Sequence, residues 1–124
     1  MADFAELVNE ARVRHLKKVQ QREQAKSYVH DVMNQAREQI EASGGTLTDA
    51  ENWSYHGLLA FNHYTLSFPA DIGVSDMELE VGGRALPEAG YEIVVGHPEN
   101  PIVVNDHLEG VAVVFDYVRE AMPN

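Results

Sequence analysis

Cysteine is absent from the 124 residues of this chain. Its absence excludes disulfide bonds, thiolate metal sites and a thiol nucleophile. Long apolar runs are missing too, because no stretch approaches the roughly 18 residues of a membrane span, and we expect no membrane contact. The length suits a single domain with one modest core.

Basic side chains are scarce in the second part of the chain. Residues 1–43 hold seven basic and seven acidic side chains, whereas residues 44–124 hold two basic and thirteen acidic ones. The net charge of −11 therefore belongs entirely to the second part. Such a charge disfavours nucleic acid as a partner. Solubility alone accounts for it, and a basic partner is the alternative interpretation.

Glycine and proline are absent from residues 3–43, which are rich in Ala, Glu, Gln, Lys and Arg. This composition predicts one long helix. Asp3 is suited to cap its start, with Glu6 three residues later, and the sequence Ser-Gly-Gly at residues 43–45 ends it. At 1.5 Å per residue the helix is about 60 Å long, which is more than so small a globule can cover.

Apolar residues gather at the two ends of this helix. The second group has spacings of 4, 3 and 4, as in a heptad seam, but the seam fails when it is carried back to Arg22 and His15. We therefore predict an oligomerisation or anchoring segment at residues 1–44, held at both ends and exposed or interrupted in the middle. The predicted interface residues are Phe4, Leu7, Val8, Ala11, Val29, Met33, Ala36 and Ile40.

The middle of the helix holds six basic residues and a single acid, Glu23. One interpretation is a solvated helix face. The other is a strip that docks on an acidic surface, such as the acidic half of a neighbouring copy, or on nucleic acid. Nucleic acid ranks low because no aromatic residues are interleaved. The strip comprises Arg12, Arg14, Lys17, Lys18, Arg22 and Lys26.

After Gly45 the apolar period changes to two, which is typical of strands. Residues 76–81 alternate acidic and apolar side chains and predict a half-buried strand with an acidic outer face. Gly82-Gly83 suits a two-residue hairpin turn, and residues 87–90 suit another turn. The expected fold class is α+β, a long N-terminal helix followed by a small antiparallel β-sandwich over residues 45–124.

Three further segments complete the predicted module. Two strands are expected on either side of Asn62-His63, and a loop is expected at residues 96–101. Residues 110–122 fit a strand by alternation and a helix by 3–4 spacing. The four valines and the glycine at the start of this segment favour the strand.

The second half resembles a small β-module of bacteriophage tail-fibre, baseplate and head-decoration proteins. The residues that carry the resemblance are Thr65–Phe68, Leu79–Leu86, Gly90–Val94, Ile102–Val104 and Gly110–Tyr117, with Gly82 in place of the usual Asn and no Asp after Gly90. The resemblance implies a structural protein of the virion, made in the host cytoplasm. Its partners would be other virion proteins, and the helix before the module would form a homo-oligomer, with a trimer favoured.

No catalytic or metal-binding pattern is present. The six histidines do not form a metal-binding motif, and the acids at residues 71–80 do not have the spacing of an EF-hand loop. We therefore expect no enzyme, no catalytic residue, no metal and no cofactor. Trp53 and Tyr55 suit core packing better than a sugar platform.

Two other functions are open at this point. The acidic second half also suits a small inhibitor that blocks a basic nucleic-acid-binding site of a host defence protein. A sugar-binding module would depend only on Trp53, Tyr55 and Tyr91.

Overall fold

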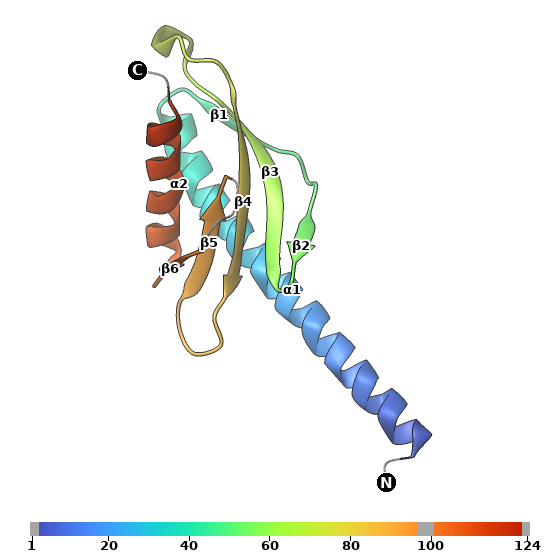
Figure 1. The fold of residues 1–124 in the computed structure, drawn as a ribbon. Coiled ribbons are helices and arrows are strands. Elements are labelled where there is room, and N and C mark those ends of the chain that lie inside the picture. The colour runs from blue at the N-terminus through green and yellow to red at the C-terminus, as the bar shows by residue number, and fades with distance from the viewer. Residues whose placement is uncertain (1–2, 97–100, 123–124) are drawn as a thin grey trace.

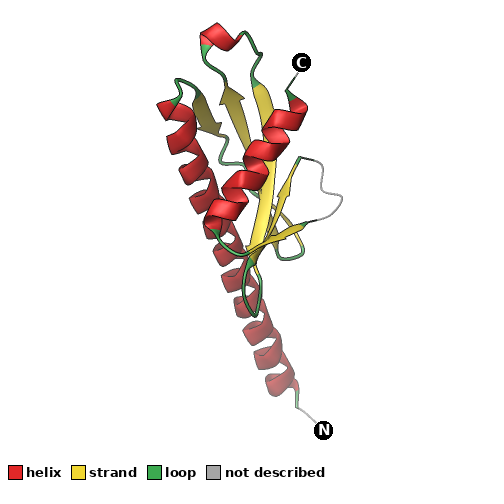
Figure 2. Cartoon of the chain, turned by 90° about the vertical axis from the view of Figure 1, so that its left-hand side faces the viewer, coloured by secondary structure: helices red, strands yellow, loops and turns green. Residues whose placement is uncertain are grey.

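The computed structural model describes residues 3–96 and 101–122. These residues form one antiparallel sheet with two helices packed on a single face (Figures 1 and 2). The predicted α+β class is confirmed. In chain order the elements are α1 (Phe4–Ala42), β1 (Thr46–Asp49), β2 (Ser54–His56), β3 (Leu59–Ser67), the 3-10 turn η1 (Ala70–Ile72), β4 (Met77–Ala85), β5 (Tyr91–Val95), β6 (Ile102–Val104) and α2 (His107–Ala121).

Helix α1 is continuous over 39 residues, as its composition predicts. The Asp3 side chain accepts a hydrogen bond of 2.8 Å from the Glu6 N–H and caps the first turn. At the other end Gly44 adopts a φ of +92°, and the Gly45 N–H donates to the Ile40 carbonyl at 3.0 Å. Both predicted helix boundaries are therefore confirmed.

The sheet has the strand order β1-β3-β4-β5-β6, and β2 also pairs with β3. β1 pairs with residues 64–67 and β2 with residues 59–61, so the two short strands share one edge of the sheet. Asn62 and His63 lie at the centre of β3, so the break predicted there is wrong. The chain turns instead at Gly57, which has a φ of +63°.

A buried asparagine explains why β1 and β2 are separate. The side chain of Asn62 is fully buried; it donates to Asp49 Oδ1 at 2.7 Å and accepts from the Asn52 N–H at 3.0 Å. The Ala50 N–H donates to the His63 carbonyl at 3.0 Å. These bonds hold residues 50–53 beside β3 as an irregular connection, because buried polar groups require hydrogen-bond partners.

The core lies between the sheet and the two helices. The C-terminal half of α1 crosses the inner face of the sheet, and α2 lies beside it on the same face (Figures 1 and 2). The predicted β-sandwich is therefore wrong in its second layer, which is helical in the described residues. The main side chains of this core are Tyr28, Val29, Val32, Met33, Ala36, Tyr64, Leu66, Leu79, Val81, Ile93, Val111, Val114 and Val118.

Gly82 and Gly83 lie inside β4, so the hairpin turn predicted there is also wrong. A Cβ at residue 82 would lie 2.4 Å from the Phe61 ring, and one at residue 83 would lie 2.9 Å from the Tyr28 ring. The two glycines therefore provide room for aromatic rings, one on each face of the sheet. The turn predicted at residues 87–90 is confirmed, since the Leu86 N–H donates to the Gly90 carbonyl at 3.0 Å.

Residues 107–121 form helix α2, so the strand predicted from residue 110 is wrong. Asp106 caps the helix by accepting a hydrogen bond of 2.9 Å from the Glu109 N–H. Val111, Val114 and Val118 form its buried stripe at a spacing of three and four. Packing against α1 outweighs the β-preference of the valines, which is a weak local term. Residues 97–100 of the expected loop lie outside the described residues.

Candidate interaction surface

The N-terminal half of α1 extends away from the rest of the molecule (Figures 1 and 2). We call residues 4–20 the arm. Every side chain of the arm is exposed, including Phe4 at 81%. An isolated helix of this length is marginal in water. The arm is helical because it continues from the half of α1 that the sheet and α2 hold in place.

The arm carries an apolar patch formed by Phe4, Leu7, Val8 and Ala11. Phe4 is 36 residues from the buried Ile40, which is ten turns at 3.6 residues per turn, so both face the same side of α1. The patch thus continues the buried stripe of the helix beyond the point where the sheet ends. Nothing among the described residues covers it.

The other four predicted interface residues have a different role. Val29, Met33, Ala36 and Ile40 are buried against the chain's own sheet and α2. The seam predicted from their spacing is therefore present, but its partner belongs to the same chain. Within the described residues only the C-terminal half of α1 contacts the body, so the predicted anchoring of the N-terminal end would have to come from another chain and stays a prediction.

The predicted basic strip is divided between the arm and the body. Arg12, Arg14, Lys17 and Lys18 are exposed on the arm. Arg22 instead contacts the body, where its Nε donates to the Gly57 carbonyl at 3.3 Å and its guanidinium lies 4.9 Å from the centre of the Tyr55 ring. The Lys26 ammonium lies 5.4 Å from the centre of the Trp53 ring. These cation–π contacts attach the β1–β2 edge to α1.

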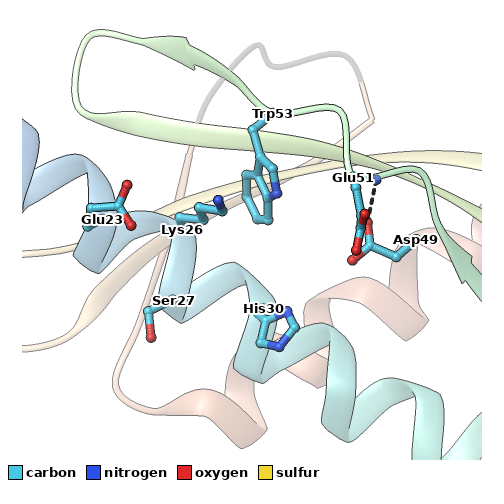
Figure 3. A pocket seen from close by; sticks show the side chains of 7 residues that line it. All are labelled: Glu23, Lys26, Ser27, His30, Asp49, Glu51 and Trp53. Atoms are coloured by element: carbon cyan, nitrogen blue, oxygen red, sulfur yellow. Dashed lines mark hydrogen bonds between the residues drawn. The ribbon is translucent and has the colours of Figure 1, made fainter.

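A polar groove lies where α1 passes this edge (Figure 3). Its volume is about 580 Å³, and its lining residues are Glu23, Lys26, Ser27, His30, Asp49, Glu51 and Trp53. Asp49 Oδ1 already accepts hydrogen bonds from the Glu51 N–H and from Asn62, and Lys26 already covers one face of Trp53. These groups hold the connection at residues 50–53 in place, so a structural role explains them.

The other candidate ligands and the aromatic residues singled out from the sequence lie apart in the described residues. No cluster of three or more His, Asp or Glu residues that could hold a metal occurs in the described ranges. Burial raises the pKa of Tyr64 to about 12 and also raises the pKa of Tyr28, so both hydroxyls stay protonated at neutral pH. Tyr91, on β5, stacks on Tyr28 at 4.2 Å, and strands β3 and β4 separate it from Tyr55 on β2, so the three residues of the sugar-binding hypothesis are not brought together.

An apolar groove is present at the end of the molecule opposite the arm. It has a volume of about 310 Å³ and lies between the end of α1, the segment around η1 and one side of α2. The segments that form it are far apart in sequence, and no local pattern signals it. Its apolar lining comprises Ile40, Leu66, Phe68, Ile72, Phe115 and Val118.

Neither a protein-family model, nor a curated protein, nor a solved structure matches this chain. In the part of the chain that the structure describes, no helix combines the length and the apolarity needed to cross a membrane. The exposed arm is the largest part of the described structure that extends from the body without a partner.

Proposed function

We propose that this chain is a non-enzymatic assembly protein that associates with other chains through the arm. The observation that carries the proposal is the apolar patch of Phe4, Leu7, Val8 and Ala11, which lies on a preformed helix outside the body. An amphipathic helix that presents apolar anchors at i, i+3, i+4 and i+7 is a recurring recognition element. Its preformed helix lowers the entropic cost of binding.

The biological setting that we propose is the virion. The chain would be a structural component of a phage tail, fibre attachment or capsid decoration, made in the host cytoplasm and bound to other virion proteins and to copies of itself. This setting derives from the sequence resemblance. In the structure Gly82-Gly83 lies inside β4 and the last segment of that pattern is helix α2, so the main structural support for an assembly role is the arm.

The proposal predicts that the arm contacts another chain through one particular side. A photo-cross-linking amino acid in place of Leu7 should give discrete adducts in the cells or particles that contain the protein. The same group in place of Val13 is a matched control, because Val13 is 56% exposed and lies on the opposite side of the arm. We expect the yield of cross-linked adducts from residue 7 to exceed the yield from residue 13 at least tenfold. No adduct from residue 7 would overturn the proposal.

The charge of the body favours a second candidate function, the inhibitor of a basic nucleic-acid-binding site. The exposed acids Asp71, Asp76, Glu78 and Glu88 belong to the body, and Arg84 is paired with Glu92 at 2.9 Å. A surface of this charge attracts basic partners in a salt-dependent manner. Binding to a basic partner that Leu7→Glu leaves unchanged would favour this function over assembly through the arm.

A further inference from the structure

The apolar groove and the apolar patch of the arm lie at opposite ends of the same molecule. Phe4 and Ile40 both belong to α1, and 36 residues at 1.5 Å per residue place them about 54 Å apart. Since α1 is uninterrupted, the arm cannot fold back to reach the groove of its own chain. Any contact between the two surfaces must therefore join different molecules.

The two surfaces match in apolarity and size. The groove has Leu66 and Val118 in its floor, Phe68 and Phe115 half-buried, and Ile72, 50% exposed, at its rim. An apolar cavity on the order of 150 Å³ is enough to hold benzene. A groove of about 310 Å³ therefore has room for a phenyl ring and a neighbouring aliphatic side chain, as Phe4 and Leu7 provide.

Charge also distinguishes the two ends. Residues 3–26 hold six basic and four acidic side chains, whereas the remainder holds three basic and sixteen acidic ones. The net charge of −11 thus divides into +2 and −13. Three exposed acids, Glu41, Asp71 and Asp116, are sequence neighbours of residues that line the groove. One of them, Asp116, lies 3.7 Å from the basic side chain of Arg119. Asp3, Glu6 and Glu10 flank the patch itself and the basic residues begin at Arg12, so the expected attraction is between residues 12–18 of an incoming arm and the acidic body rather than at the groove.

We propose that the apolar groove binds the arm of a second copy of this chain. Phe4 and Leu7 would enter the groove, and Arg12, Arg14, Lys17 and Lys18 would face the acidic body. This inference depends on the proposed function and adds the partner surface to it. Because each copy has one arm and one groove at opposite ends, the contact is head-to-tail and generates closed rings, such as the trimer that the resemblance implies, or open chains.

The test is a mixing experiment with the full-length chain. Leu7→Glu disables the arm and Ile72→Glu disables the groove; both residues are at least half exposed, so the fold should tolerate the changes. Wild type should increase in mass with concentration, and each variant should associate at least tenfold more weakly. An equimolar mixture of the two variants should form a dimer and nothing larger, because only one intact arm and one intact groove remain.

Two exposed positions provide matched controls. Val13→Glu adds the same charge on the opposite side of the arm and should weaken association far less than Leu7→Glu, whereas Val103→Glu lies on β6, where the side chain is 66% exposed, and should associate like wild type. Circular dichroism should give the same helix content for all variants, and Ile72→Ser is a milder change with the same expected direction. Analytical ultracentrifugation measures each mass.

The outcomes separate this inference from the proposed function. If Ile72→Glu assembles like wild type, the arm binds at another surface. That result would contradict the groove as the binding site, but the arm would still be the docking element. If the mixture stays monomeric, head-to-tail docking is overturned. If wild type is monomeric at every concentration, self-association is overturned, and cross-linking from residue 7 to an unrelated chain would still support the proposed function.

Discussion

Phe61 and Gly82 are paired across β3 and β4, and the ring occupies the space in which any larger residue would place its Cβ. From the sequence alone, two adjacent glycines between alternating runs indicate a turn, because a hairpin commonly requires positive φ values. The same residue type also permits close packing. The position of the distant Phe61 decides between the two, and no pattern near residue 82 reveals it.

This contact leads to a prediction about stability. Replacing a strand glycine by alanine normally stabilises a protein by about 0.5–1 kcal/mol. Gly82→Ala should instead destabilise it by about 1–3 kcal/mol, since the new Cβ would lie 2.4 Å from the Phe61 ring. Urea unfolding measures the change. Phe61→Leu in the same chain should recover part of the loss, and a Gly82→Ala variant as stable as wild type would contradict this account.

The two helices show what local signals reveal about an element. Helix α1 was predictable in its full extent, because its composition, its N-terminal cap and its terminal glycines all agree. Helix α2 was not, because periods of two and of 3.6 both fit its apolar residues. A local signal for the helix was present in Asp106 and Glu109, which cap its first turn. Periodicity and β-propensity alone do not include this cap and favour the strand.

The cap of α2 also supports a prediction about stability. Asp106→Ala should lower the free energy of unfolding by about 1 kcal/mol, because the Glu109 N–H loses its acceptor and α2 is part of the core. Asp3→Ala removes an equivalent bond of 2.8 Å, but from the arm, which does not contact the body. Its effect on global unfolding should be close to zero. Equal losses for the two variants in urea unfolding would mean that the arm contributes to the stability of the body.

At the scale of the whole molecule, charge is distributed unevenly between the arm and the body. Head-to-tail association should therefore weaken several-fold between 50 and 500 mM NaCl (about 14 to 4 Å of screening length), because salt screens exposed charges. Sedimentation at both concentrations measures it. Association that strengthens with salt would indicate a purely apolar contact.

A pair of single charge reversals tests the same asymmetry. Lys17→Glu and Arg119→Glu change the net charge by the same amount, but Lys17 lies on the arm and Arg119 follows Val118 of the groove. The first should weaken association and the second should not, since it makes the groove end more acidic. The Arg119–Asp116 pair is exposed, so its loss should have little effect on stability. Equal effects of the two reversals would show that only net charge matters.

Local sequence patterns were enough to predict the long helix with both of its ends, the presence of strands after residue 45, the acidic outer face of β4 and the separation of charge along the chain. These features depend on residues that are close in sequence, where propensity, capping and periodicity act. Only the folded arrangement of the chain shows that half of α1 belongs to the core, that residues 107–121 form a helix, that the described strands form one sheet and that an apolar groove lies opposite the arm. Each of these depends on contacts between segments far apart in the chain, since burial is a property of the assembled surfaces and not of any one segment.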